Sequence, residues 1–213
     1  MVSESNLIIG RETLKVSQII DFLNNNNAKI LLDNEANSKI LAGLNFLEKN
    51  FDQITYGVNT GFGPMADRII PRECIVALQE NLIRSHALGL GNFLPDNYVL
   101  ATMIVRLNTL AKGASAVSLE LVEKLVVFIN ERILPVVPEH GAVGTSGDLV
   151  QLAHIALGII GSGEASYKGK SREVSELLRE LSIEPHILRP KEGLSLINGT
   201  SAMTGIGVIF SKE

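Results

Sequence analysis

The sequence predicts a mainly α-helical protein: a helical bundle with a small N-terminal region rich in loops and hairpins. Apolar residues recur at helical spacing over most of the chain, several of these runs have residues typical of helix ends, and strand-like alternation is rare. With 213 residues, 46% of them hydrophobic, the chain can bury a sizeable core. We therefore expect one domain over residues 1–213.

Two amphipathic helices and a loop are expected first. Residues 14–23 and 35–48 each carry apolar residues on one helical face, and a run of four asparagines follows the first helix. Residues 54–64 contain three glycines and one proline, a composition that favours neither helix nor strand. This segment is therefore expected to form a loop.

The next helix is expected to begin at Pro71, because proline suits the first turn of a helix, and to extend to residue 88. A polar residue lies at the end of its apolar face, which consists of Ile75, Leu78, Leu82 and His86.

The centre of the bundle is expected in residues 96–112 and 118–133, two long and strongly apolar helices. Ser118, followed by Glu120, is a typical start for the second. Residues 148–160 are apolar almost all round, which is typical of a helix buried inside a larger assembly. The remaining expected elements are a hairpin at 164–170, a short helix at 174–181 and an apolar run at 193–210.

Composition and charge exclude several classes of partner. A net charge of −4 and a pI near 5.6 give no basic surface for nucleic acid. The N-terminus lacks the pattern of a secretion signal, and no apolar stretch is long enough to span a membrane. Cys74 is the single cysteine, and we expect it to be buried and inert. These features predict a cytoplasmic protein that binds neither nucleic acid nor a membrane, and we expect no metal site.

Three polar features occur where helix packing would favour apolar or plain loop residues: Tyr56 in the glycine loop, His86 on an apolar face, and the turn at 144–148. Each has an ordinary structural interpretation. Tyr56 and His86 could be hydrogen-bonded core residues, and the turn could be a helix start capped by Ser146 or Asp148, or a backbone anion site.

Four motifs together resemble the histidine, phenylalanine and tyrosine ammonia-lyases and their aminomutase relatives. The motifs are YGVNTGFG at 56–63, RSHALGLG at 84–91, GTSGDLVQLAHIAL at 144–157 and INGTSAMTG at 197–205. Their order and spacing agree with that family over nearly all of the chain.

The resemblance implies a prosthetic group, 4-methylidene-imidazol-5-one, which forms autocatalytically from Thr145-Ser146-Gly147 within a loop at 140–148. The nitrogen of Gly147 would attack the carbonyl carbon of Thr145, and Ser146 would lose its hydroxyl as water. Glycine can adopt the backbone bend that this requires, and Asp148 matches the residue that assists cyclisation. Thr145 replaces the usual alanine but takes no direct part in this chemistry.

The resemblance also assigns roles to the other residues. Tyr56, on a mobile loop at 54–66, matches the base that removes a β-proton from the substrate. Asn198 matches an asparagine near the prosthetic group and the substrate amine, and Gly63 is assigned to substrate binding. His86 matches the histidine of relatives that accept tyrosine or histidine, which argues against phenylalanine. The motifs favour tyrosine first and histidine second.

The family's fold implies a longer protein than this one. We expect the chain to be an N-terminal portion that lacks the central helical second half, and to assemble with a second-half polypeptide or as a homotetramer. Its small-molecule substrate would be an amino acid. Two alternatives to an ammonia-lyase stay open: an aminomutase of the same family, and a non-catalytic supporting subunit of a split lyase.

Overall fold

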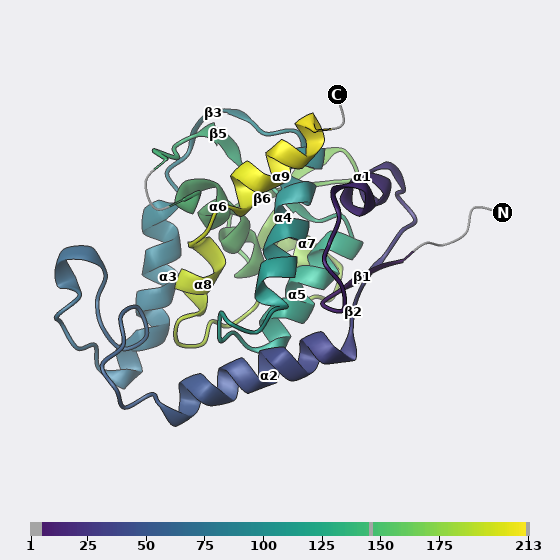
Figure 1. Ribbon diagram of the computed structural model, residues 1–213. Helices are drawn as coiled ribbons and strands as arrows, with labels where there is room; N and C mark the ends of the chain where they lie inside the picture. Colours follow the sequence, from purple (N-terminus) through teal and green to yellow (C-terminus); the bar gives the residue numbers. More distant parts are fainter. Residues whose placement is uncertain (1–5, 145–146, 212–213) are drawn as a thin grey trace.

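A computed structural model describes residues 6–144 and 147–211, and it confirms a mainly helical fold (Figure 1). Most of the predicted helical segments are present with bounds that differ by a few residues. The helices are α1 Val16–Asn24, α2 Asn34–Lys49, α3 Ile75–His86, α4 Asp96–Leu110, α5 Leu119–Asn130, α6 Leu149–Ile159, α7 Val174–Glu180, α8 Glu192–Ile197 and α9 Ser201–Phe210.

Helix α4 forms the centre of the molecule, as the sequence predicts. Nine of its fifteen residues are buried, and it lies beside α9 and α5 (Figure 1). Helix α6 is also largely enclosed, since seven of its eleven residues are buried by the rest of the described chain. Helix α5 begins after Ser118, whose side chain accepts a hydrogen bond from the backbone N–H of Leu121, so the predicted cap is confirmed.

Short strands lie at the edges of this helical core. The predicted hairpin is confirmed as an antiparallel pair, whereas the other pairs were not predicted. The strands are β1 Leu7–Ile9 parallel to β2 Ile30–Leu32, β3 Leu90–Phe93 antiparallel to β5 Pro138–His140, and β4 Leu134–Pro135, β6 Glu164–Tyr167 and β7 Lys170–Glu173 in one antiparallel sheet.

The start of α3 differs from the prediction. Pro71 precedes a short 3-10 turn, Arg72–Cys74, and the α-helix begins only at Ile75 and ends at His86. The expectation of a buried thiol was wrong, because Cys74 is exposed. The reason is its position just before the helix, where the next residue, Ile75, occupies the buried side.

The segment between α2 and α3 projects from one side of the molecule (Figure 1). It contains the predicted tyrosine loop and a 3-10 turn, Gly63–Met65. Within the described ranges, no helix has the length and apolar character needed to cross a membrane.

Candidate active site

Four of the predicted site residues line one cavity of about 530 Å³. Tyr56 and Gly63 come from the loop between α2 and α3, His86 is the last residue of α3, and Asn198 directly follows α8. The other lining residues are mostly apolar: Phe62, Leu82, Leu149 and Leu194. An apolar pocket with a few convergent polar groups is the usual form of a small-molecule site.

Tyr56 is a partly exposed residue of the cavity wall. Its side chain is 52% exposed, so the interpretation as a core tyrosine is wrong. The phenol oxygen accepts a hydrogen bond of 3.2 Å from the backbone N–H of Gly63, and the ring lies edge-on to Phe62 with centroids 5.9 Å apart. The hydroxyl is thus oriented by its own loop.

His86 is half-buried and presents one ring nitrogen that has no partner among the described residues. Its Nδ1 lies 2.8 Å from the carbonyl oxygen of Leu82 and 3.1 Å from Oγ of Ser85. A neutral imidazole that donates from Nδ1 to the carbonyl has Nε2 as a hydrogen-bond acceptor. The residue can therefore accept a hydrogen bond from a ring N–H or O–H in the cavity.

The backbone at Gly147 is closely paired with the segment that follows α8. Gly147 and Gly199 form a parallel bridge, and the N–H of Asp148 donates to the carbonyl of Gly199 at 2.8 Å. Gly147 has φ +95°, in the left-handed region that favours glycine. Thr145 and Ser146 lie outside the described residues. Leu149, which lines the cavity, places this turn beside the site.

The side chain of Asp148 contacts a different helix from the one that it was expected to cap. It makes no capping bond to α6; instead its Oδ2 accepts a 2.9 Å hydrogen bond from the backbone N–H of Met203 in the first turn of α9. A carboxylate at a helix N-terminus is favourable, and this one is only 8% exposed. Asp148 therefore fixes the start of α6 to the start of α9.

Two buried charged residues that the sequence did not identify hold α8 in place. The first is Arg106 on α4, whose Nη2 donates to the backbone carbonyls of Asn198, at 2.9 Å, and Ser195. Burial lowers the pKa of Arg106 to about 10, so it remains a cation at neutral pH. One signal could have revealed it: Arg106 is the only Lys or Arg in the apolar sequence of α4.

The second is Glu192, which is 1% exposed and accepts four hydrogen bonds. They come from Oγ of Ser118 at 2.6 Å, the N–H of Ser118 at 2.9 Å, Nε2 of His186 at 2.8 Å and the N–H of Arg189 at 2.7 Å. Burial by itself raises the pKa of Glu192, but these bonds outweigh it and the pKa is lowered. Glu192 thereby joins the first turn of α8 to the start of α5.

Replacing Glu192 with glutamine should destabilise the protein by roughly 3 kcal/mol at neutral pH, because four donors lose a charged acceptor. The folded-state pKa is lower than the unfolded one, so the stabilisation is present above the ordinary glutamate value of about 4.3 and is lost as the pH falls through the folded value. Urea unfolding at about pH 7 and about pH 3.5 measures this: the difference between wild type and Glu192→Gln should shrink in acid.

Glu180 provides the control for this effect. Its pKa is also lowered, by a hydrogen bond and charge attraction from Arg172, but the pair is exposed and screened by solvent. Glu180→Gln should therefore leave the unfolding free energy almost unchanged at both pH values. If Glu180→Gln and Glu192→Gln lowered the unfolding free energy equally, burial would not be the cause of the effect at Glu192.

In the part of the chain that the structure describes, no group of three or more His, Cys, Asp or Glu side chains could hold a metal ion.

The fold and this cavity define a class, and comparison with known proteins identifies it. A family profile described as aromatic amino acid lyase matches residues 14–213, so the chain belongs to this family. The histidine ammonia-lyase of Macrococcus caseolyticus (strain JCSC5402) is 53% identical over 163 residues, 76% of this chain and 33% of that protein. The histidine ammonia-lyase of Staphylococcus aureus (strain JH9) is 44% identical over 209 residues, 97% of this chain and 41% of that protein.

A solved structure supports the same relationship. Tyrosine aminomutase from Streptomyces globisporus is 38% identical, with a TM-score of 0.89 over 96% of this chain and 38% of that chain. The chain thus spans between a third and about two fifths of the length of these relatives. Since both sequence relatives are named histidine ammonia-lyases, the order with tyrosine before histidine receives no support from them.

Proposed function

We propose that the chain is the N-terminal portion of an ammonia-lyase that eliminates ammonia from an L-amino acid with a polar aromatic ring, histidine first and tyrosine second. The observation that carries this proposal is the cavity that Tyr56, Gly63, His86 and Asn198 line together. The motifs favour tyrosine as the first substrate, but the two sequence relatives are named histidine ammonia-lyases, and their names support histidine as the first substrate. The remainder of the site would come from a second-half polypeptide or from further copies in a tetramer.

The residues around the turn at 144–148 fit the proposed prosthetic group. Gly147 has a backbone conformation that other residues rarely adopt, and a Cβ at this position would lie 2.3 Å from the carbonyl oxygen of Gly199. Only glycine satisfies both constraints. Glycine is also the residue whose backbone can take the bend that ring closure through its nitrogen needs. Thr145, Ser146 and Gly147 would form and hold 4-methylidene-imidazol-5-one, which when present supplies an electrophile next to the cavity.

The other residues would bind the substrate and move its proton. Tyr56 would accept the β-proton, and the N–H of Gly63, which donates to its oxygen at 3.2 Å, would hold that oxygen in place. The amide of Asn198 would contact the substrate amine. Nε2 of His86 would accept a hydrogen bond from the substrate ring, and the loop at 54–66 would exclude water when it closes.

Intact mass tests the proposal most directly. The chain would be expressed with any adjoining or partner polypeptide that supplies the remaining length of its relatives; we call this the assembled protein. Its mass should fall short by two water molecules, one formed from the carbonyl oxygen of Thr145 when the ring closes and one from the hydroxyl of Ser146. Ser146→Ala should abolish the two-water deficit, because the second water then has no source. Release of ammonia from L-histidine should accompany the deficit. An assembled protein of unmodified mass would overturn the proposal and favour a supporting, non-catalytic subunit.

An aminomutase is the second candidate, because the tyrosine aminomutase structure is 38% identical to this chain. The two activities differ in whether ammonia adds back to the product. Incubation with L-tyrosine and chromatography of the products distinguish them, since a mutase yields the β-amino acid and a lyase yields only the unsaturated acid.

His86 provides a test of substrate choice. His86→Phe removes the acceptor at Nε2 and should raise the ratio of kcat/KM for phenylalanine to that for histidine by about a hundredfold. The side chain is at the end of α3 and half-buried, so the fold should tolerate the change. Kinetics with the three amino acids measure the ratio.

His140→Phe is the matched control, because His140 lies on β5 and does not line the cavity. It should leave the ranking of substrates as in wild type. If His86→Phe also leaves the ranking of substrates unaltered, His86 takes no part in substrate recognition.

A further inference from the structure

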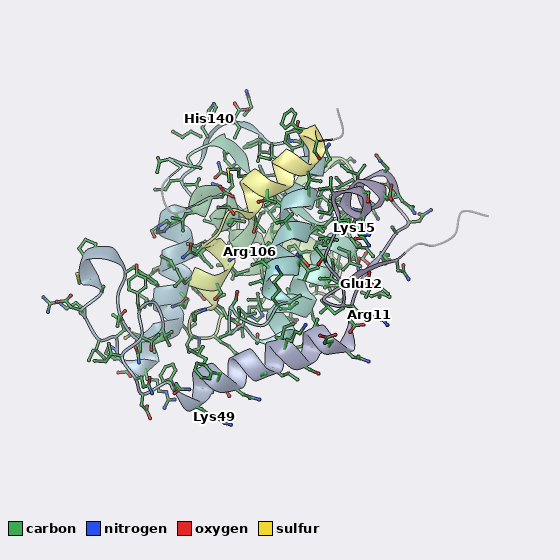
Figure 2. The ribbon with its side chains drawn as sticks, viewed as in Figure 1. Arg11, Glu12, Lys15, Lys49, Arg106 and His140 are labelled. Atoms are coloured by element: carbon green, nitrogen blue, oxygen red, sulfur yellow. The ribbon has the colours of Figure 1, made fainter. Side chains whose placement is uncertain are left out.

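Arg106 is a charged residue buried in the interior of the protein. Figure 2 shows it in the middle of the molecule; it belongs to α4, which packs against α9. The residue is 3% exposed, and no Asp or Glu among the described residues forms an ion pair with it. Its Nε also has no partner there. A buried cation without a carboxylate costs stability, so packing alone does not account for this arginine.

The bonds of Arg106 are directed at the end of α8. Nη2 donates to the carbonyls of Ser195 and Asn198, where the negative end of the helix favours a cation. Lys191 lies close by and donates to Oγ of Ser195 at 3.1 Å; its pKa is lowered by burial and then by repulsion from Arg106. In the described part of the chain, Arg106 thus lies near another basic residue and not near an acidic one, which again favours a positional role over a stabilising one.

The same guanidinium lies against the backbone that pairs with the prosthetic-group loop. A Cβ on Gly199 would be 2.6 Å from Nη1 of Arg106, so residue 199 can approach the guanidinium only as glycine. Gly199 also pairs with Gly147, and its carbonyl accepts a 2.8 Å hydrogen bond from the N–H of Asp148. Gly199 therefore lies next to both the guanidinium of Arg106 and the backbone of Gly147.

We infer that Arg106 is a positioning residue for the reactive loop and for Asn198. By holding the carbonyl of Asn198 it leaves that amide side chain on the cavity wall, and by fixing Gly199 it sets the place of Gly147 and Asp148. This inference rests on the proposed function.

Arg106→Met, Arg106→Lys and Arg132→Met test it in the assembled protein. Arg132 is the matched control: it is half-buried, and its Nη2 likewise donates to two carbonyls, those of Phe22 and Asn25, but at the end of α1, away from the cavity. The rate at which chains lose two waters would be followed by intact mass during expression, and the melting temperature of each variant would be recorded.

Arg106→Met should form the prosthetic group about a hundredfold more slowly than wild type, since displacement of reacting groups by about 1 Å has effects of this size. Arg106→Lys, which keeps the charge and a donor, should recover about tenfold of that loss. Arg132→Met should lose two waters at the wild-type rate, even if its melting temperature falls as far as that of Arg106→Met. A purely structural role would slow the two methionine variants equally.

Water loss at the wild-type rate in Arg106→Met overturns the inference. If Arg106→Met does not fold, Arg106→Lys decides: a rate at least tenfold below wild type supports the inference, and an unchanged rate overturns it. Failure of the proposed function is distinguishable, because the wild-type protein itself would then lack the two-water deficit, and both proposals would fall together.

Discussion

Replacing Tyr56 with phenylalanine should lower turnover by about three orders of magnitude while the prosthetic group still forms. The substitution removes one hydroxyl, which accepts a 3.2 Å hydrogen bond from the N–H of Gly63. Because Tyr56 is 52% exposed and its ring still packs edge-on to Phe62, the fold should be retained. Measurement of kcat with L-histidine, together with the intact mass of the same preparation, separates loss of the base from loss of the electrophile.

Tyr98→Phe is the control for this substitution. Tyr98 lies on α4, packs edge-on to Phe210 and does not line the cavity, so its variant should turn over substrate as wild type does. Unchanged turnover in Tyr56→Phe would remove this residue from the proton transfer. A fall in both kcat and the two-water deficit would mean that the loop also takes part in forming the group.

The helices could be predicted because they are long enough to show their period. Residues 96–112 repeat apolar positions over several turns, and Ser118 is a hydrogen-bonding start signal that acts on its own helix. The pair β1 and β2 could not be predicted in this way, since each strand has three residues and the parallel pairing joins segments on either side of α1. A run of three residues does not establish alternation.

The site residues also differ in whether their role depends on nearby or on distant parts of the sequence. His86 was identifiable from sequence because a polar side chain breaks an apolar face, which is a local signal. The buried state of Glu192 depends not only on the nearby His186 but also on Ser118, which lies 74 residues away in the sequence. Likewise, the bond of Asp148 to the first turn of α9 replaces the local cap that the sequence favoured, because the N–H of Met203 is brought to it only by tertiary packing.

Replacing Gly147 with alanine should prevent formation of the prosthetic group and destabilise the protein by roughly 3 kcal/mol. The residue has φ +95°, and its new Cβ would lie 2.3 Å from the carbonyl oxygen of Gly199. Since that neighbour is backbone, it can move only by weakening the 2.8 Å bond that it accepts from Asp148. Urea unfolding and intact mass of the assembled protein measure the two effects.

Gly163→Ala is the control that separates the cost of the left-handed backbone conformation from the cost of the contact between the new Cβ and Gly199. Gly163 also has a positive φ, +76°, but among the described residues no atom lies within 4 Å of its would-be Cβ. It should cost about 1 kcal/mol, from the left-handed conformation alone, and should leave the two-water deficit intact. If Gly147→Ala lost its waters as fast as this control, the pairing of Gly147 with Gly199 would not be what places the reactive nitrogen. Arg106 could then not position the loop through Gly199. Gly147→Ala therefore also tests the contact between Gly199 and Gly147 on which the inference about Arg106 depends.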